Sequence, residues 1–198
     1  FPLSFLPSYA HEGGLEAVMD RLRDTSERKR LSDYLDNDYP RPIHDAVFSY
    51  VPLNSELEGM SLPEVASLRG KSLGETLCEI LLENEGQVGY WGSPPVSVSI
   101  WDQINRDAME LLSRPDYMVG SDSIPLGSNP HPRAYGTFPR IIGRFQRKYN
   151  VMSLQETIQR LTDNPARRFG LESRGRIKPG YFADIVLFDP DSVIDNST

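Results

Sequence analysis

Residues 117–140 read YMVGSDSIPLGSNPHPRAYGTFPR. A short apolar run, 117–120, ends at one carboxylate, Asp122, and is followed by a loop rich in Gly, Ser and Pro. An aspartate in a surface loop would be ordinary. However, α/β enzymes keep their reactive groups at the carboxyl ends of parallel strands. The rest of the sequence has to decide between these two interpretations.

The residues before this stretch predict a strand, a helix and a second strand. Residues 96–100 alternate between apolar residues and serine, which is typical of a strand, and Asp102 can cap the amphipathic helix that follows. Pro115 closes that helix, and 117–120 form the next strand. Because a helical crossover joins parallel neighbours, this unit predicts an α/β fold with Asp122 at the carboxyl end of its second strand.

The flanking segments predict further helices and two more strands. Four positions carry a capping residue followed three residues later by Glu, which predicts a helix start at each: Asp24 with Glu27, Ser61 with Glu64, Ser72 with Glu75, and Ser153 with Glu156. Residues 46–51 and 183–188 predict strands. The last of these has no obvious partner nearby, so its backbone groups need a hydrogen-bonding neighbour from elsewhere.

Composition excludes several classes of protein. A chain of 198 residues with 38% hydrophobic residues is large enough for one sizeable domain or two small ones. Its net charge of −7 argues against a general nucleic-acid binder. No run is long enough to cross a bilayer. No signal peptide is visible, so a cytoplasmic location is predicted. The single cysteine, Cys78, lies in an apolar helical pattern and is expected to be a buried, inert thiol.

The titratable residues show no metal site within this chain. The three histidines, His11, His44 and His131, form neither an H-x-H pair nor a Cys/His cluster. His131 follows Asp122 in the same loop and is a candidate ligand contact. No Asp or Glu occurs between 123 and 155, yet Arg133 lies in this segment. A guanidinium there can hold a carboxylate through a bidentate pair, although binding and structural roles are equally open on local grounds.

Two motifs resemble a known family. VGSD at 119–122 and PHPRAYGTFPR at 130–140 closely resemble the late signature of the N-acyl-D-amino-acid deacylases, the D-aminoacylases of the metal-dependent amidohydrolase superfamily. The tail GRIKPGYFADIVLFDP at 175–190 continues the match, although such an ending by itself indicates only an amidohydrolase. The resemblance is strong from about 117 to 193 and looser before it.

The resemblance implies a segment of a longer enzyme, since the chain begins at Phe1 rather than at a methionine and lacks the family's metal histidines. The implied fold is a partial TIM barrel, with its last strands and helices, an inserted small α+β subdomain and one returning β-sandwich strand. The implied domains are an inserted subdomain with its barrel connection at 1–75, the C-terminal part of the barrel at 76–172, and the start of the sandwich segment at 173–198.

The resemblance also implies the chemistry. Asp122 matches the aspartate that takes a proton from the attacking water and later protonates the departing amine. Arg133 matches the arginine that binds the substrate carboxylate. Ser123, His131 and Trp101, the last at the end of the preceding predicted strand, are the other expected substrate contacts. The substrate would be a small N-acyl-D-amino acid.

The resemblance assigns zinc to the missing N-terminal part of the same protein, and no cofactor is expected in this segment. Two alternatives stay open. One is another amidohydrolase, similar to dihydroorotases or hydantoinases, and the other is a non-catalytic fragment that lacks the metal ligands. Neither a nucleic-acid nor a membrane partner is expected, and the sequence does not decide whether the protein forms oligomers.

Overall fold

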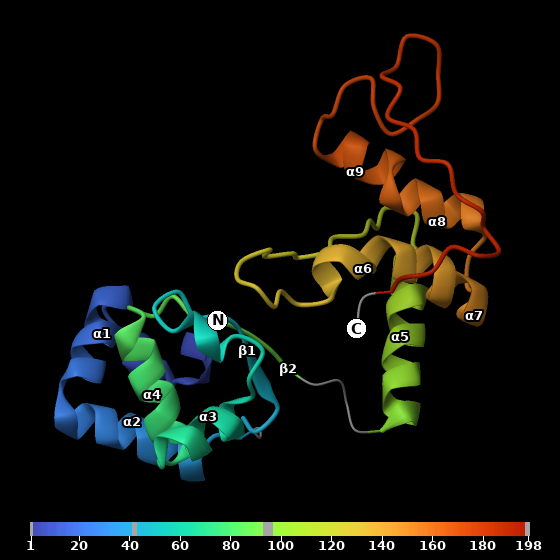
Figure 1. The fold of residues 1–198 in the computed structure, drawn as a ribbon. Coiled ribbons are helices and arrows are strands. Elements are labelled where there is room, and N and C mark those ends of the chain that lie inside the picture. The colour runs from blue at the N-terminus through green and yellow to red at the C-terminus, as the bar shows by residue number, and fades with distance from the viewer. Residues whose placement is uncertain (1, 41–42, 93–96, 197–198) are drawn as a thin grey trace. The chain divides into compact units, whose positions relative to one another are not determined.

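The computed structural model describes residues 2–40, 43–92 and 97–196. They form two compact units (Figure 1). Within the described residues, the first unit comprises 2–92 and the loop Ile124–His131, and the second comprises 97–123 and 132–196. The predicted domains 1–75, 76–172 and 173–198 stay a prediction.

The first unit is built mainly from helices around an aliphatic core. Two 3-10 turns, η1 (Pro2–Phe5) and η2 (Ser8–His11), precede α1 (Gly14–Arg23) and α2 (Thr25–Asn37), and α3 (Leu62–Arg69) and α4 (Leu73–Glu83) follow. Leu22, Leu31, Leu77 and Leu81 are fully or almost fully buried and bring α1, α2 and α4 together. Cys78 of α4 is also buried, as predicted.

The predicted helix starts are confirmed. Asp24 accepts hydrogen bonds from the backbone N–H groups of Ser26 and Glu27, at 2.9 and 2.8 Å, at the start of α2. Reciprocal capping boxes, which satisfy backbone donors that a helix start leaves unpaired, open the other three helices: Ser61 with Glu64 at α3, Ser72 with Glu75 at α4, and Ser153 with Glu156 at α8 (Leu154–Leu161).

The described residues contain a single sheet, of two strands. β1 (Ala46–Tyr50) is the predicted strand, and it pairs antiparallel with β2 (Gly89–Gly92), with Phe48 opposite Tyr90. β2 was not among the strands that the sequence predicted. The short 3-10 turn η3 (Ser55–Leu57) follows β1. The prediction of two parallel strands joined by a helix is therefore wrong for this chain.

Three predicted strands are not strands in the structure. α5 (Val98–Leu112) occupies most of the first, 96–100, whose residue Val96 lies outside the described residues. Ser97 rather than Asp102 caps this helix, accepting from the backbone N–H of Ile100 at 3.4 Å. Residues 117–120 and 183–188 run as irregular chain. A short apolar run forms a strand only where a neighbouring strand satisfies its backbone, and no strand among the described residues does so here.

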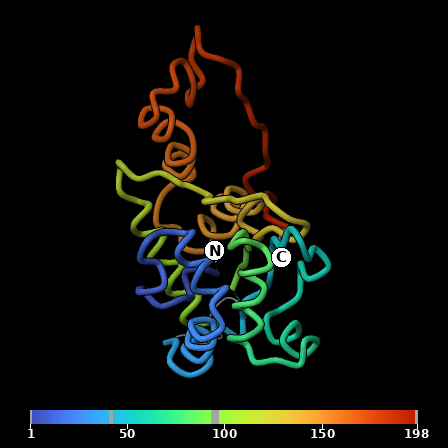
Figure 2. The backbone as a smooth tube through the Cα atoms, turned by 90° about the vertical axis from the view of Figure 1, so that its left-hand side faces the viewer, coloured from blue at the N-terminus to red at the C-terminus, as the bar shows by residue number. Residues whose placement is uncertain are grey.

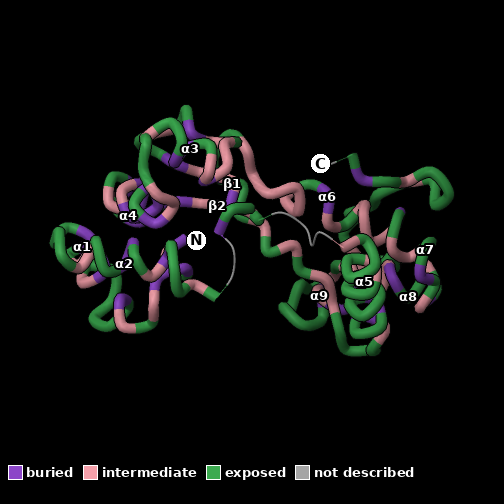
Figure 3. Tube along the Cα trace, turned by 90° about the horizontal axis from the view of Figure 1, so that it is seen from below, coloured by how far each residue is buried: buried purple, intermediate pink, exposed green. Residues whose placement is uncertain are grey.

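The second unit is a helical assembly around a smaller core. α6 (Arg133–Arg140), the π-helix η4 (Ile141–Gln146) and α7 (Arg147–Tyr149) form one continuous helical run, and α8 and α9 (Asp163–Arg168) follow. Its core includes Met109, Leu112, Tyr149 and Met152. Figure 3 shows that most of α5 is exposed apart from a narrow buried stripe. None of the described helices is long and apolar enough to cross a membrane.

The C-terminal segment is extended and returns to the helical run. In Figures 1 and 2 it leaves α9 as a wide loop and comes back past α8 towards α6 and α7. Its end is anchored by Asp195, whose side chain is completely buried. Arg140 donates to Oδ2 of Asp195 from Nε at 2.9 Å and from Nη2 at 2.6 Å. Arg144 Nε lies 2.8 Å from Oδ1, as an ion pair without hydrogen-bond alignment.

Asp195→Asn should lower the free energy of unfolding by about 1–3 kcal/mol at neutral pH, because an amide removes charge-assisted bonds from a buried site. Burial tends to raise the pKa of Asp195, but the Arg140 hydrogen bond and the charges of Arg140 and Arg144 outweigh it and lower the pKa. Since the folded-state pKa is lowered, the stabilisation is complete above the unfolded-state pKa of about 4 and disappears as pH falls through the folded value. Denaturant titrations at several pH values test this, with the exposed Asp191→Asn as the control. An equal loss of unfolding free energy in Asp195→Asn and Asp191→Asn would contradict this prediction.

Candidate active site

Asp122 lies in an irregular segment of the second unit, between residues 117–120 and the Gly/Ser/Pro loop. Its φ of 47° is in the left-handed region, which aspartate and asparagine tolerate better than most residues. Its side chain is 82% exposed, and Oδ2 lies 2.9 Å from Nη2 of Arg133. The carboxylate is therefore accessible to solvent and faces one specific cation.

Arg133 is the first residue of α6, which begins immediately after Pro132. Its backbone carbonyl accepts a hydrogen bond from Oγ1 of Thr137 at 2.8 Å, and its side chain is 38% exposed. The structure thus brings together the two residues for which the family resemblance implies acid–base and carboxylate-binding roles. An ion pair this exposed contributes only about 0–1 kcal/mol to stability, so a competing anion can replace Asp122 as the partner of Arg133 at little cost.

Ser123 and His131 flank the loop between these two residues. Ser123 is half-buried beside Asp122. His131 belongs to the first unit, where its ring packs edge-on against Trp91 of β2 with the centroids 6.4 Å apart. His131 therefore contacts an aromatic side chain of the first unit.

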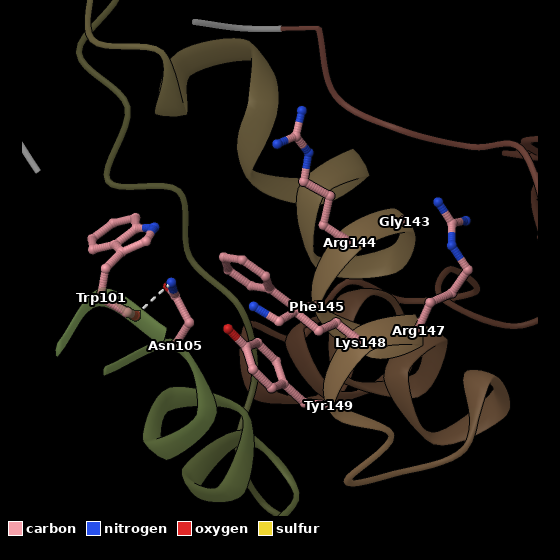
Figure 4. A pocket seen from close by; sticks show the side chains of 8 residues that line it. All are labelled: Trp101, Asn105, Gly143, Arg144, Phe145, Arg147, Lys148 and Tyr149. Atoms are coloured by element: carbon pink, nitrogen blue, oxygen red, sulfur yellow. Dashed lines mark hydrogen bonds between the residues drawn. The ribbon is translucent and has the colours of Figure 1, made fainter. Parts of the chain in front are cut away.

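Trp101 was expected at the end of a strand and instead lies in the first turns of α5. It lines a hollow with Asn105, Phe145 and Tyr149, and Asn105 donates from Nδ2 to the Trp101 carbonyl at 2.8 Å (Figure 4). Neither Asp122 nor Arg133 lines this hollow. Trp101 is thus accessible, but in surroundings that differ from those predicted.

Three cations border the same hollow, and each has a protein partner. Arg144 pairs with Asp195, and Arg147 donates to the backbone carbonyls of Pro190 and Val193 at 2.8 and 2.9 Å. Lys148 contacts Asp102 on α5, which also accepts a hydrogen bond from the Tyr149 hydroxyl at 3.0 Å. These cations therefore join the helical run to α5 and to the C-terminal segment within the second unit.

The described residues do not fit a zinc ion. Nowhere in 2–40, 43–92 and 97–196 do three His, Cys, Asp or Glu side chains come close enough to share a metal. Burial raises the pKa of the Cys78 thiol to about 12, which keeps it protonated and unsuited to be a ligand or a nucleophile. A structural or catalytic zinc site needs at least three protein ligands, so no step of the chemistry can be assigned to zinc from these residues.

Sequence reasoning missed two carboxylates that make long-range contacts, one in each unit. Glu58 accepts hydrogen bonds from both the backbone N–H and the hydroxyl of Ser128, each at 2.6 Å. Asp195 holds the start of η4 through Arg140 and Arg144. Ser128 lies 70 residues from Glu58, and Arg144 lies 51 residues from Asp195. Helical or strand periodicity therefore gives no signal for these contacts.

Comparison with known proteins shows the family of this chain. Residues 6–195 match the amidohydrolase family. A D-aminoacylase of Alcaligenes xylosoxydans xylosoxydans is 38% identical over 143 residues, which cover 72% of this chain but 27% of that protein. A dihydroorotase of Clostridium acetobutylicum matches over a much shorter stretch, 44 residues at 52% identity, or 22% of this chain and 10% of that protein.

A solved structure agrees with the sequence match. The N-acyl-D-glutamate deacylase of Bordetella bronchiseptica, in a complex with zinc and a phosphonate mimic of the tetrahedral intermediate, superposes with a TM-score of 0.64 and 32% identity. The alignment covers 79% of this chain and 30% of that one. The chain thus spans about a third or less of the proteins it resembles. It belongs to the amidohydrolase family, among the D-aminoacylases.

Proposed function

We propose that this chain is part of a zinc-dependent amidohydrolase that hydrolyses N-acyl-D-amino acids to a carboxylate and a free D-amino acid. The observation that carries the proposal is the contact between Asp122 and Arg133, 2.9 Å apart on an accessible surface. A carboxylate that can move protons and a guanidinium that can hold a carboxylate are the two groups that such a substrate needs from this segment.

The Asp122–Arg133 pair suggests a separate role for each of the two residues. An incoming α-carboxylate would replace Asp122 as the partner of Arg133, because the exposed ion pair is weak and a guanidinium fits a carboxylate in a bidentate manner. Asp122 would then be available to accept a proton from the water that attacks the amide carbonyl. The same carboxyl group would deliver that proton to the nitrogen as the C–N bond breaks.

The zinc ligands would come from segments that the relatives possess outside the matched region, since this chain covers 27% of the D-aminoacylase and its described residues hold no ligand cluster. The same segments would complete the barrel to which this chain contributes its last part. They would also pair with residues 183–188, where Val186 and Leu187 are 83% and 97% exposed. Exposed apolar side chains in a row are typical of a surface that another element covers.

Ser123 and His131, next to the two principal residues, stay proposed substrate contacts. Trp101 also stays a proposed substrate contact, and it lines a hollow that neither Asp122 nor Arg133 borders. The substrate is a small molecule, and neither nucleic acid nor a membrane is part of the proposal.

The test uses the complete polypeptide, meaning this chain together with the segments that match the rest of its relatives. We expect it to hydrolyse members of a panel of N-acetyl-D-amino acids and to leave their L-enantiomers largely intact. Dihydroorotate and hydantoins, offered in the same assay, test the alternative amidohydrolase activities. Hydrolysis of the cyclic substrates alone would favour the alternative, and no hydrolysis of any substrate would favour a non-catalytic role.

The 198-residue chain alone should bind no stoichiometric zinc and hydrolyse none of these substrates, because its described part offers no set of three ligands. Metal analysis of the purified chain after exposure to zinc and dialysis, together with the same substrate panel, tests this. The complete polypeptide is the control in both measurements. One equivalent of tightly bound zinc, or measurable deacylation by the short chain, would contradict the expectation.

A further inference from the structure

The loop between Asp122 and Arg133 belongs to a different unit from the residues it connects. Residues Ile124–His131 are part of the first unit, whereas Asp122 and Arg133 are in the second. The chain therefore leaves the second unit after Ser123, packs on the first, and returns at Pro132. Whatever holds this loop limits where both flanking residues can lie.

One carboxylate holds the loop at its middle. Oε2 of Glu58 accepts from the N–H and from the hydroxyl of Ser128, while Oε1 accepts from the backbone N–H of Val51, at 2.9 Å, just beyond β1. Burial tends to raise the pKa of Glu58, but these hydrogen bonds outweigh it and lower the pKa. Glu58 is therefore charged at neutral pH and joins the loop directly to the end of β1.

Close backbone contacts fix the loop on either side of Ser128. Gly127 has a φ of +79°, and a Cβ there would lie 2.0 Å from the carbonyl oxygen of Ser49 in β1. A Cβ on Gly59 would meet Nδ2 of Asn129 at 3.3 Å. With His131 packed on Trp91 of β2, the loop rests against both strands of the sheet, and only glycine allows the approach at 127.

We propose that Glu58 is a positioning residue of the deacylase site, acting through the loop that connects Asp122 to Arg133. This rests on the proposed function. The hydrogen bonds of Glu58 described above run to Val51 and Ser128, so its effect on the site would be transmitted through the loop. By tying Ser128 to β1 it restricts the loop, and through the chain that continues into Pro132 it limits the freedom of Arg133.

Glu58→Gln is the discriminating variant. Both oxygens of Glu58 accept from backbone N–H groups, whereas glutamine has one acceptor and one donor. Whichever way the amide turns, its NH₂ group faces the N–H of either Ser128 or Val51, so one side of the connection must open. The control is Glu56→Gln, an exposed glutamate on η3 in the same stretch of chain.

The first measurement is hydrogen–deuterium exchange of the peptide covering 123–131 in the complete polypeptide. Exchange should become about tenfold faster or more in Glu58→Gln, since a hydrogen bond to a charged group is lost, and should not change in Glu56→Gln. Gly127→Ala, which keeps the carboxylate but cannot keep the close approach to Ser49, should accelerate exchange in the same peptide. Unchanged exchange in both loop variants would overturn the proposal.

The second measurement compares an N-acetyl-D-amino acid with its C-terminal amide. In Glu58→Gln, kcat/KM for the acid should fall about tenfold, as expected when the binding group Arg133 is displaced. The kcat/KM for the amide should fall much less. A merely structural role of Glu58 would lower kcat/KM equally for the acid and the amide. That result would overturn the proposal while leaving the deacylase assignment intact. Absence of deacylation by the unmodified polypeptide would refute the proposed function, and this inference with it.

Discussion

Asp122→Asn in the complete polypeptide should reduce kcat by about 10²–10⁴-fold while leaving substrate affinity and zinc content nearly unchanged. An amide has almost the same shape as the carboxylate but cannot accept the proton of the attacking water, and general acid–base catalysis is typically worth this factor. The measurement is steady-state kinetics on N-acetyl-D-amino acids, with metal analysis of the same preparation.

The structure makes asparagine the appropriate substitution here. Asp122 has a φ of 47°, a conformation that asparagine tolerates as well as aspartate does, whereas alanine would add backbone strain. The lost ion pair with Arg133 is exposed and contributes little to stability. Asp116→Asn is a matched control, because Asp116 is also exposed and lies 4.0 Å from an arginine, Arg114. Near-normal turnover in Asp122→Asn, or an equal loss in the control, would show that Asp122 is structural.

Local signals in the sequence predicted the helix starts well and the strands poorly. A capping box such as Ser72 with Glu75 lies within four residues, so the interaction that starts α4 is visible in the sequence. Residues 183–188 have a strand's composition, but a strand also needs a neighbour. No strand among the described residues provides one, and these side chains stay exposed.

In the candidate site too, local motifs were visible in the sequence, whereas contacts between distant residues were not. Asp122 and Arg133 were selected because both belong to motifs that resemble those of a known family, and their catalytic and binding roles stay predictions. Their contact at 2.9 Å was not predicted, since the intervening loop has no periodicity that would bring its ends together. Glu58 was missed for a related reason: it contacts Ser128, 70 residues away, through a fold that local patterns do not describe.

Arg133→Lys should reduce kcat/KM for N-acetyl-D-amino acids by about 10²-fold. Lysine keeps the positive charge but replaces a planar, two-pronged donor with a single ammonium, so the α-carboxylate would be held in a less defined position. Small displacements near the reacting centre can cost about this factor in rate. Arg114→Lys, an exposed arginine of the same unit that lies over the Tyr117 ring, is the control and should change little.

The pair of substrates separates recognition from packing. In the unmodified protein the C-terminal amide of the same acyl-amino acid should be a poor substrate, because it offers Arg133 no charge. The kcat/KM for the amide should therefore fall little further in Arg133→Lys. The kcat/KM for the acid should instead fall most of the way to that of the amide. Arg133 also faces Asp122, so lysine could disturb the acid–base group as well. Such a disturbance would slow both substrates alike. Equal losses for acid and amide would thus mean that Arg133 supports the loop and Asp122, and that another residue holds the substrate carboxylate.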